Sequence, residues 1–527
     1  MSGEAQPFRR RILVNTAAVG FGNVWAIVIS VVTVPLTLHG LGTDAFGTWV
    51  LLNTFSAMSG WFSLADLGIG AAATREIARR SSVGDGPGAA RATASAFVLF
   101  LAFGLVFSVL FGLIGPAVLP SVFSTPEGLV AALQFAIVVF AVQVLVDQVT
   151  SAAEDALDGL QRTDLGRGVD AVRRTAVAVA VAVVALAGGG LQGAALASLV
   201  ASVAGVAVAV IALHRLQRGW WRGPNRSDMR ALLAYGKTLA VLQPLGVITR
   251  QMDRLIAGIV LGPAAVTLVE LATQVQNGAS AVLSASTYAA TPASSWVHAR
   301  DEPGLLRELV SRGTKYALLA TYPVTVGAAI LAPDLIHVWV GPAYAAAAGL
   351  TVLALADIIM SAPVQVGSNV LIGTGRAADV LKAALATVAI NLVASVVLAH
   401  LVGTAGVFLG TLIALLFLVP ALTRATCRQV ELAPLTFVRQ AVTPAALACI
   451  PMALVVGLVE VLPLRPLTTL LIAVPVGGAI YLATVMVLVL SPPERTELRS
   501  VLRRGRSDDG VPSGEVDPDD DRPDDGR

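Results

Sequence analysis

Residues 35–80 read PLTLHGLGTDAFGTWVLLNTFSAMSGWFSLADLGIGAAATREIARR. This stretch contains the end of one apolar segment, a short polar turn at residues 39–44 and a second apolar segment. The second segment has about 20 residues at roughly 1.5 Å each, which is the length needed to cross the hydrocarbon core of a bilayer. A glycine-rich exit then leads into arginines. We interpret the stretch as a transmembrane helical hairpin.

The composition of the whole chain agrees with a membrane protein. The 527 residues are 56% hydrophobic and 13% charged, and their mean hydropathy is +0.77. A soluble domain of this length does not bury so much apolar surface. The first apolar segment is about 25 residues long, beyond the roughly 7–15 of a cleavable signal peptide, so we expect it to be retained as a span. Two cysteines, Cys427 and Cys449, provide neither a disulfide framework nor a metal motif.

The hydropathy pattern predicts an all-α polytopic fold with fourteen membrane spans. Their approximate limits are 14–37, 45–66, 93–115, 128–150, 172–187, 191–213, 236–260, 265–289, 315–334, 346–371, 379–400, 404–423, 440–462 and 467–490. With the N-terminus in the cytoplasm, all of the 36 lysines and arginines fall on the cytoplasmic side except Arg250, Arg254 and Arg465. The positive-inside rule therefore predicts a multi-pass protein of the cytoplasmic membrane with both termini cytoplasmic.

An internal repeat divides the predicted spans. Leu41 and Gly42 match Leu261 and Gly262 at equivalent turns, and GLQGAALASLVA from Gly190 parallels GTAGVFLGTLIA from Gly403. Six spans separate the copies, so we expect two pseudo-symmetric six-helix lobes that face each other, with two further helices outside the repeat. The predicted units are an N-lobe (1–213), a basic cytoplasmic linker (214–235), a C-lobe (236–423), two C-terminal helices (424–490) and a disordered acidic cytoplasmic tail (491–527).

Polar side chains recur at helical spacing inside several predicted spans, where they are costly unless they face water or another helix. The candidate lining residues are Asn53, Gln143, Asp147, Asp253, Glu270, Gln274, Asp357 and Gln365. One interpretation is hydrogen bonding between helices of a packed bundle. The recurrence on equivalent helices of both lobes favours a hydrated cavity between them.

Arg250 and Arg254 lie on adjacent turns of the predicted span 236–260. A cation near the bilayer centre costs about 2.5–3.5 kcal/mol on insertion scales, so both need partners or water. One hypothesis is an ion pair with Asp253, Glu270 or Asp147. The other is that the guanidinium groups bind a phosphate-bearing head group, for which their planar fork is suited. The two hypotheses are compatible. Nearby, Pro244 and Gly246 predict a kink.

Signatures of an enzyme are missing from the sequence. The five histidines are scattered, HExxH does not occur, and no large extramembrane segment is available for a sugar-nucleotide site. We therefore predict neither a catalytic site nor a cofactor or metal centre, and no nucleic-acid partner. Transport would have to be driven by a gradient or by the substrate itself.

Two motifs carry a family resemblance. LGTDAFGTWVLL with LADLGIGAAATREIAR, from Leu41 to Arg79, resembles the first hairpin of the Wzx-like polysaccharide flippases in the MATE/Wzx/MurJ exporter superfamily. MDRLIAGIVLGPAAVTLVELA, from Met252, is similar to the pattern that opens the second lobe of this family. It departs from that pattern at Ala257, where Ile is usual, and at Thr267 and Val269, which replace Gly and Tyr.

The resemblance implies a flippase that moves polyprenyl-diphosphate-linked oligosaccharide to the outer leaflet by alternating access. It also implies membrane lipids, a polysaccharide polymerase and glycosyltransferases as partners, and a groove for the lipid tail at the last two helices. Arg250 and Arg254 would then contact the diphosphate. Asp147, Asp253, Glu270 and Asp357 would be polar or ion-coupling groups of the cavity.

Two other functions fit parts of the pattern. The carboxylates of the spans 128–150, 265–289 and 346–371 would suit a MATE-like, cation-coupled multidrug exporter. A membrane-embedded glycan polymerase or ligase is the third possibility, but the two-lobe repeat and the lack of a large external loop disfavour it.

Overall fold

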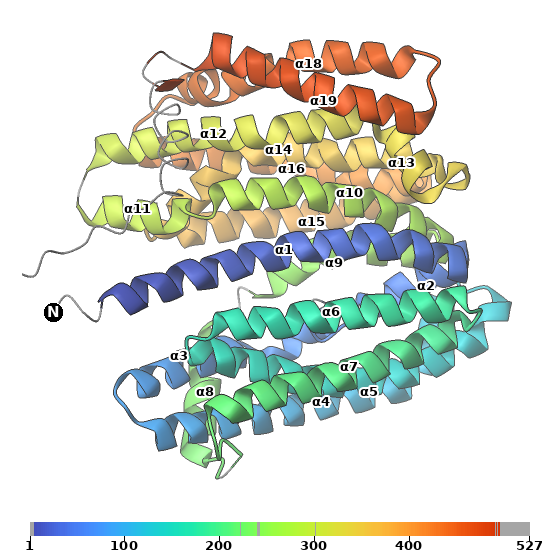
Figure 1. Cartoon of the computed structure of the whole chain (residues 1–527), viewed down its shortest axis with the longest axis vertical. Coiled ribbons are helices and arrows are strands. Elements are labelled where there is room, and N and C mark those ends of the chain that lie inside the picture. Colours follow the sequence, from blue (N-terminus) through green and yellow to red (C-terminus); the bar gives the residue numbers. More distant parts are fainter. Residues whose placement is uncertain are drawn as a thin grey trace, which may run out of the picture.

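The computed structural model describes residues 5–490 except 59, 222, 240–242 and 301, and also residues 492, 494 and 495. Throughout these residues the regular secondary structure is helical, and the long helices run side by side across Figure 1. The predicted all-α fold is confirmed. Nearly all of the predicted disordered tail, 491–527, lies outside the described residues.

The helices are numbered in chain order. They are α1 (Ala5–Leu41), α2 (Thr43–Asn53), the 3₁₀ helix η1 (Trp61–Asp66), α3 (Ile69–Ser82), α4 (Gly86–Val122), α5 (Glu127–Gly159), α6 (Thr163–Leu186), α7 (Gly190–Leu216), α8 (Arg226–Leu239), α9 (Gln243–Val260), α10 (Pro263–Thr287), α11 (Ala290–Ala299), α12 (Pro303–Ile330), α13 (Ala332–Val340), η2 (Pro342–Tyr344), α14 (Ala346–Gly373), α15 (Ala377–Val402), α16 (Thr404–Gln429), α17 (Pro434–Phe437), the π-helical turn η3 (Val438–Val442), α18 (Thr443–Val461), α19 (Pro466–Thr484) and the π-helical turn η4 (Val485–Val489).

In the described part of the chain, nine helical segments are long and apolar enough to cross a membrane. A tenth is added if α12 and α13, which meet at a bend of 74°, form one broken span. The other four predicted spans fall on α2, α6, α9 and α10. α2 has only 11 residues, and the other three carry charged side chains such as Arg173, Arg254 and Glu270. The number fourteen therefore stays a prediction, since α2 is too short and α6, α9 and α10 carry charged side chains.

The predicted second span, 45–66, is wrong as a single continuous helix, because α2 ends at Asn53. The hydroxyl of Thr54 donates to the Leu51 carbonyl (2.6 Å), and the Trp61 amide donates to the Thr54 carbonyl (2.8 Å). Threonine, serine and glycine compete with helical hydrogen bonding in this way. A Cβ at Gly60 would overlap the backbone of Thr54, so only glycine allows this fold-back. The span is broken near its middle.

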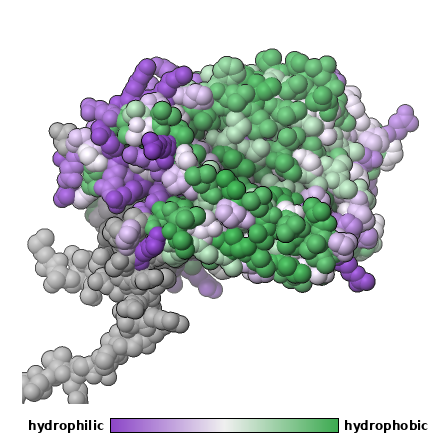
Figure 2. Space-filling view, turned by 90° about the horizontal axis from the view of Figure 1, so that it is seen from above, coloured by the Kyte–Doolittle hydropathy of each residue, from purple (hydrophilic) through white to green (hydrophobic). Residues whose placement is uncertain are grey.

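The surface divides into polar ends and an apolar belt. Figure 2 shows hydrophilic residues concentrated at one end of the molecule, beside a broad hydrophobic belt. We refer to this end as the basic end, because Arg79, Arg162, Arg376 and Arg428 lie at its helix termini. In the belt many large apolar side chains are exposed, among them Leu113 at 75%. A surface this apolar requires a lipid environment, so the chain is a multi-pass membrane protein.

The long helices form two bundles and a C-terminal pair. In Figure 1, α4 to α8 lie towards the bottom, α10 to α16 above them, and α18 and α19 at the top. α1 packs on α6, whereas α9 packs on α10, α15 and α16. We refer to α1–α8 as the first bundle and to α9–α16 as the second bundle. This arrangement is the predicted pair of lobes with two helices outside the repeat.

α8 belongs to the first bundle although it precedes α9 directly. It packs on α3 and α4 and extends across the predicted boundary between linker and C-lobe at 235/236. Arg80 of α3 pairs with Asp228 of α8 (2.7 Å) and with Glu76 (2.6 Å). Hydrogen bonds from Arg79 and Arg80 lower the pKa of Glu76 to about 2. The chain therefore passes from one bundle to the other between α8 and α9. The predicted kink near Pro244 borders residues 240–242, which lie outside the described residues.

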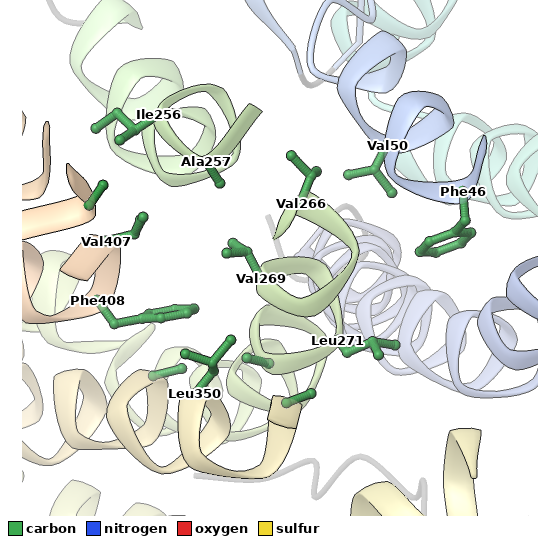
Figure 3. Close-up of a cluster of buried hydrophobic side chains, with 14 of the residues drawn as sticks. Phe46, Val50, Ile256, Ala257, Val266, Val269, Leu271, Leu350, Val407 and Phe408 are labelled. Carbon is green, nitrogen blue, oxygen red and sulfur yellow. The ribbon is translucent and has the colours of Figure 1, made fainter. Parts of the chain in front are cut away.

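An apolar cluster joins the bundles at the end opposite the basic end. Figure 3 shows Phe46 and Val50 of α2 facing Val266 and Leu271 of α10, with side chains of α9, α14 and α16 on the far side. Two hydrogen bonds reinforce this contact: Thr267 donates to the Thr43 carbonyl (2.7 Å) and Trp339 of α13 donates to the Val31 carbonyl of α1 (2.7 Å). We refer to this contact as the apolar seam. It closes the interface between the bundles at that end.

Close helix packing at the seam depends on Gly47. A Cβ at this position would overlap the carbonyl oxygen of Pro263 at the start of α10. In membranes, where lipid tails are as apolar as leucine, such backbone contacts at small residues contribute much of helix association. The glycine in the motif LGTDAFGTWVLL therefore has a packing role.

We expect the substitution Gly47→Ala to destabilise the protein by about 1–3 kcal/mol, since the added methyl group must push α2 away from α10. The apparent melting temperature of the purified protein in detergent measures this effect. Gly327→Ala is the matched control, because Gly327 is also helical but has no atom within 4 Å of the added Cβ. Equal melting temperatures for the two variants would contradict the packing role of Gly47.

Candidate functional site

A cavity of about 340 Å³ lies between the two bundles. Helices α1, α2 and α6 line it from the first bundle, and α9 and α10 line it from the second. Its polar lining residues are Thr33, Thr37, Asn53, Thr54, Arg173, Arg174, Gln251, Arg254 and Glu270. We refer to it as the central cavity. Three guanidinium groups and one carboxylate around a small space make it suited to an anion.

The contribution of the second bundle is an ion pair. Arg254 Nε of α9 lies 2.5 Å from Glu270 Oε2 of α10, and the two side chains are 15% and 8% exposed. Arg254 also donates to Gln251 Oε1 (3.1 Å), and Gln274 donates to the other oxygen of Glu270 (2.7 Å). The predicted ion pair of Arg254 is therefore present, with Glu270 as its partner. One edge of the guanidinium group is held by the protein while the side chain still lines the cavity.

The contribution of the first bundle is a second charged cluster, on α5 and α6. Arg173 lies 3.6 Å from Asp147 and 3.4 Å from Asp170, and Arg174 lies 2.7 Å from Asp170. Asp147 is 3% exposed and Arg173 is 7% exposed, so this pair is buried, whereas the Arg174 side chain is 45% exposed. Gln143 donates to Asp147 over 3.5 Å. Asp147 and Gln143 thus support Arg173 from behind and do not line the cavity themselves.

Sequence reasoning did not name Arg173 and Arg174 as site residues, because we counted them on the cytoplasmic side, at the start of the predicted span 172–187. In the structure α6 begins at Thr163, so both arginines are helical and reach the central cavity. The signal that could have identified them is Asp170, three and four residues before the arginines, since that spacing places the three side chains on one helical face.

Buried atoms in this cluster lack hydrogen-bond partners among the described residues. They are Gln143 Oε1, Asp147 Oδ1 and Arg173 Nε. Buried polar atoms in native proteins are nearly always hydrogen-bonded, to protein, water or ligand. Arg173 Nε is therefore a buried donor inside the first bundle that no described residue accepts from.

A larger cavity of about 580 Å³ lies inside the second bundle. Its lining includes Arg250, Asp253, Asp357, Asn391 and Thr411. Gln276 donates to Asp357 (2.5 Å), and the hydroxyl of Thr411 lies 3.5 Å from Asp253 and 3.3 Å from the Asn391 amide oxygen. We refer to it as the bundle cavity. Two carboxylates, an amide oxygen and a hydroxyl converge there.

The two cavities share a wall. Gln251 and Arg254 line both of them. Arg254 therefore lies between the arginine-rich lining of the central cavity and the oxygen-rich lining of the bundle cavity. A change of charge in either space acts on the same guanidinium group.

The remaining predicted residues fall in different places. Asn53 lines the central cavity while its amide donates to the Trp49 carbonyl (2.8 Å). Arg250 is exposed, lines only the bundle cavity, and has no carboxylate within ion-pair distance among the described residues. Gln365 is exposed and lines neither cavity. The structure thus brings together Arg254, Glu270, Asn53, Asp253 and Asp357 but separates Gln365 from them.

A third hollow, of about 340 Å³, is an apolar groove between α12, α13, α18 and α19. Gly327, Leu331, Val456 and Gly477 are among its lining residues. None of these four helices lines the central cavity, and α18 and α19 lie at the outer edge of Figure 1. An acyl chain is the kind of ligand that such a lining accommodates.

The amino-acid sequence matches the model of one protein family. The family is described as polysaccharide biosynthesis protein, and the match covers residues 41–349. No curated protein sequence matches the chain.

The fold matches solved structures over most of the chain. The lipid II flippase MurJ in its inward closed conformation has a TM-score of 0.71 at 12% identity, covering 93% of this chain and 100% of that chain. An inward-facing multidrug resistance MATE family transporter of the MOP superfamily has a TM-score of 0.63 at 14% identity, covering 80% and 98%. A MOP superfamily transporter from Pyrococcus furiosus has a TM-score of 0.51 at 17% identity, covering 79% and 96%.

At such identities these matches establish the fold. All three solved structures are of transport proteins. They confirm that the chain has the fold of the predicted MATE/MurJ-type exporters.

We expect Glu270→Gln to lower the free energy of unfolding by about 1–3 kcal/mol, since Arg254 then lacks a charged partner inside the protein. The melting temperature in detergent reports this loss. The double variant Arg254→Gln/Glu270→Gln should recover part of it because no unpaired charge remains. Glu308→Gln, which breaks the exposed pair with Arg312, is the control. If Glu270→Gln were as stable as that control, the ion pair would not be structurally important.

Proposed function

Because the chain belongs to the polysaccharide biosynthesis protein family, we propose that it moves polyprenyl-diphosphate-linked oligosaccharide across the cytoplasmic membrane by alternating access. Both termini would be cytoplasmic, and the basic end would face the cytoplasm, as the positive-inside rule requires. The glycosyltransferases that build the lipid-linked sugar and the polymerase that consumes it would be its partners.

The observation that carries this proposal is the arginine lining of the central cavity. Arg173 and Arg174 come from the first bundle and Arg254 from the second, so a ligand between them contacts both bundles. A diphosphate presents several oxygens to these planar donors and can be held from two sides. Because the same head group contacts both bundles, its binding is sensitive to their relative orientation.

The predicted diphosphate contacts were Arg250 and Arg254. Arg254 lines the central cavity, and we propose it as a direct contact. Arg250 lines the adjacent bundle cavity, one helical turn away. In the proposed cycle it would attract the head group electrostatically or contact it after the bundles have rotated.

Outward movement of the head group would be electrically favourable. A lipid diphosphate carries roughly two negative charges, and each gains about 2.3 kcal/mol per 100 mV when it leaves an inside-negative compartment. Movement of the complete head group would then gain about 4–5 kcal/mol per 100 mV. Export therefore does not require ATP.

The bundle cavity is the proposed site of ion coupling. Asp253 and Asp357, with the oxygens of Asn391 and Thr411, resemble the oxygen donor sets that hard cations prefer. Arg254 lines this cavity as well, so a cation bound there would alter how strongly Arg254 attracts an anion in the central cavity. Asp147 and Glu270, the other predicted coupling groups, would act by positioning Arg173 and Arg254.

Alternating access would require the apolar seam to open and the basic end to close. The seam is held by van der Waals contacts and few hydrogen bonds, so it can separate without leaving many unpaired polar groups. The apolar groove between α12, α13, α18 and α19 would hold part of the polyprenyl chain while the head group crosses.

We expect Arg250→Ala/Arg254→Ala to reduce flipping of a fluorescent polyprenyl-diphosphate oligosaccharide at least about tenfold, because charged hydrogen bonds worth about 1.5–3 kcal/mol are lost. The measurement uses proteoliposomes and a membrane-impermeant quencher or lectin. Arg79→Ala removes an exposed arginine and serves as the control. Insertion should be unchanged in all variants. Unchanged flipping in the double variant would refute the assignment of these arginines.

The MATE fold and the carboxylates of the bundle cavity also suit a cation-coupled drug exporter, and a dye-efflux assay separates the two functions. We expect no sodium- or proton-dependent extrusion of a cationic dye, because the arginines of the central cavity repel cations. The same vesicles should flip the lipid-linked oligosaccharide. Gradient-dependent dye extrusion without lipid flipping would favour the exporter instead.

A further inference from the structure

The basic end of the second bundle carries arginines without acidic partners. Arg307 of α12, Arg424 and Arg428 of α16 and Arg439 of η3 have no carboxylate within ion-pair distance among the described residues. All four are exposed. We refer to these four residues as the arginine face.

Three of these arginines, Arg307, Arg424 and Arg428, line two hollows, and Arg439 precedes Gln440, which lines the first of them. Arg307 donates to the carbonyls of Val430 (3.0 Å) and Glu431 (2.9 Å), which fixes it between the hollows. One hollow, of about 360 Å³, includes Gly304, Arg307 and Gln440 in its lining. The other, of about 430 Å³, includes Arg424 and Arg428. The hollows would therefore offer a bound peptide or head group both a recess and positively charged side chains.

The C-terminal part of the chain reaches this face. Glu494 lies 3.1 Å from Lys315 of α12 and accepts a hydrogen bond from the hydroxyl of Tyr316 (2.6 Å). Glu494 also lines the first hollow, beside Arg307. The residues that follow Arg495 therefore start at the edge of the arginine face.

The sequence beyond this point is strongly acidic. Residues 507–527 read SDDGVPSGEVDPDDDRPDDGR, with nine carboxylates and two arginines. The residues between 495 and 508 can span about 40 Å when extended at roughly 3.3 Å each. Tethering also raises the local concentration of the acidic segment, to the millimolar range for a short linker.

We propose that residues 508–525 dock on the arginine face of the same chain. The acidic segment supplies the carboxylates that Arg307, Arg424, Arg428 and Arg439 lack, and its attachment at Glu494 favours it over any free anion. Docking covers a patch that would otherwise attract anionic phospholipid head groups. The inference concerns this face only and is independent of the transported substrate.

Cysteine cross-linking in the full chain tests the docking. In a background with Cys427→Ala and Cys449→Ala, Ser513→Cys labels the acidic segment without changing its charge. Gly304→Cys labels the first hollow, and Gly168→Cys labels the basic end of the first bundle as the matched control. Both glycines are exposed and have no atom within 4 Å of an added Cβ. The protein is held in nanodiscs of neutral lipid and exposed to a mild oxidant.

At low salt, we expect the disulfide between positions 513 and 304 to form at least about fivefold faster than the disulfide between positions 513 and 168. This preference should disappear near 0.5 M salt, because charges are then screened within a few ångströms. Adding Arg424→Gln/Arg428→Gln should reduce the preference for position 304 about as much as high salt does. Equal rates at the two positions, or a preference insensitive to salt, would overturn the proposal.

Nanodiscs that contain anionic phospholipid distinguish the competing occupant. If the tail is the occupant, cross-linking at position 304 persists there. Loss of that cross-link, recovered in neutral lipid, would assign the arginine face to lipid head groups and overturn docking of the tail.

Discussion

A charged side chain inside a bilayer has to be paired or hydrated, and Arg254 is the position where this constraint shapes the molecule. Its ion pair with Glu270 joins α9 to α10, and its free edge lines the space between the bundles. Without the pair, an uncompensated guanidinium would lie in the membrane interior. Without the cavity, the arginine would have no access to a ligand. Arg254 therefore combines a charged partner inside the protein with contact to the polar cavity.

The same constraint explains why the polar helices converge. Charged side chains of α6, α9 and α10 line the central cavity, and the short helix α2 lines it with them. The apolar helices α4, α7, α15, α18 and α19 lie outside them and expose large side chains to lipid. The break in the second span adds to this arrangement, because Asn53 and Thr54 at the end of α2 turn polar groups towards the cavity.

The apolar seam between the bundles and the ion pair inside the first bundle differ in how easily they can change. At the apolar seam, Phe46, Val50 and Leu271 touch through surfaces that another apolar surface can replace. At the basic end, α8 is held to the first bundle by Arg80 and Asp228, so the connection to α9 is anchored on one side. The seam can therefore separate with fewer unpaired polar groups than the contact between α3 and α8.

The sequence by itself determined the membrane class, the all-α fold, the two-lobe repeat and the family. These follow from hydropathy, from glycine positions such as Gly42 and Gly262, and from local motifs, all of which are properties of neighbouring residues. It also identified Arg254 and Glu270 as charges that require partners. The tertiary structure alone decided that they pair with each other, that Arg173 and Arg174 join them from α6, and that Gln365 lies elsewhere. Side chains far apart in the sequence meet only through helix packing, and helical spacing gives the face of a residue but not the neighbour that this face meets.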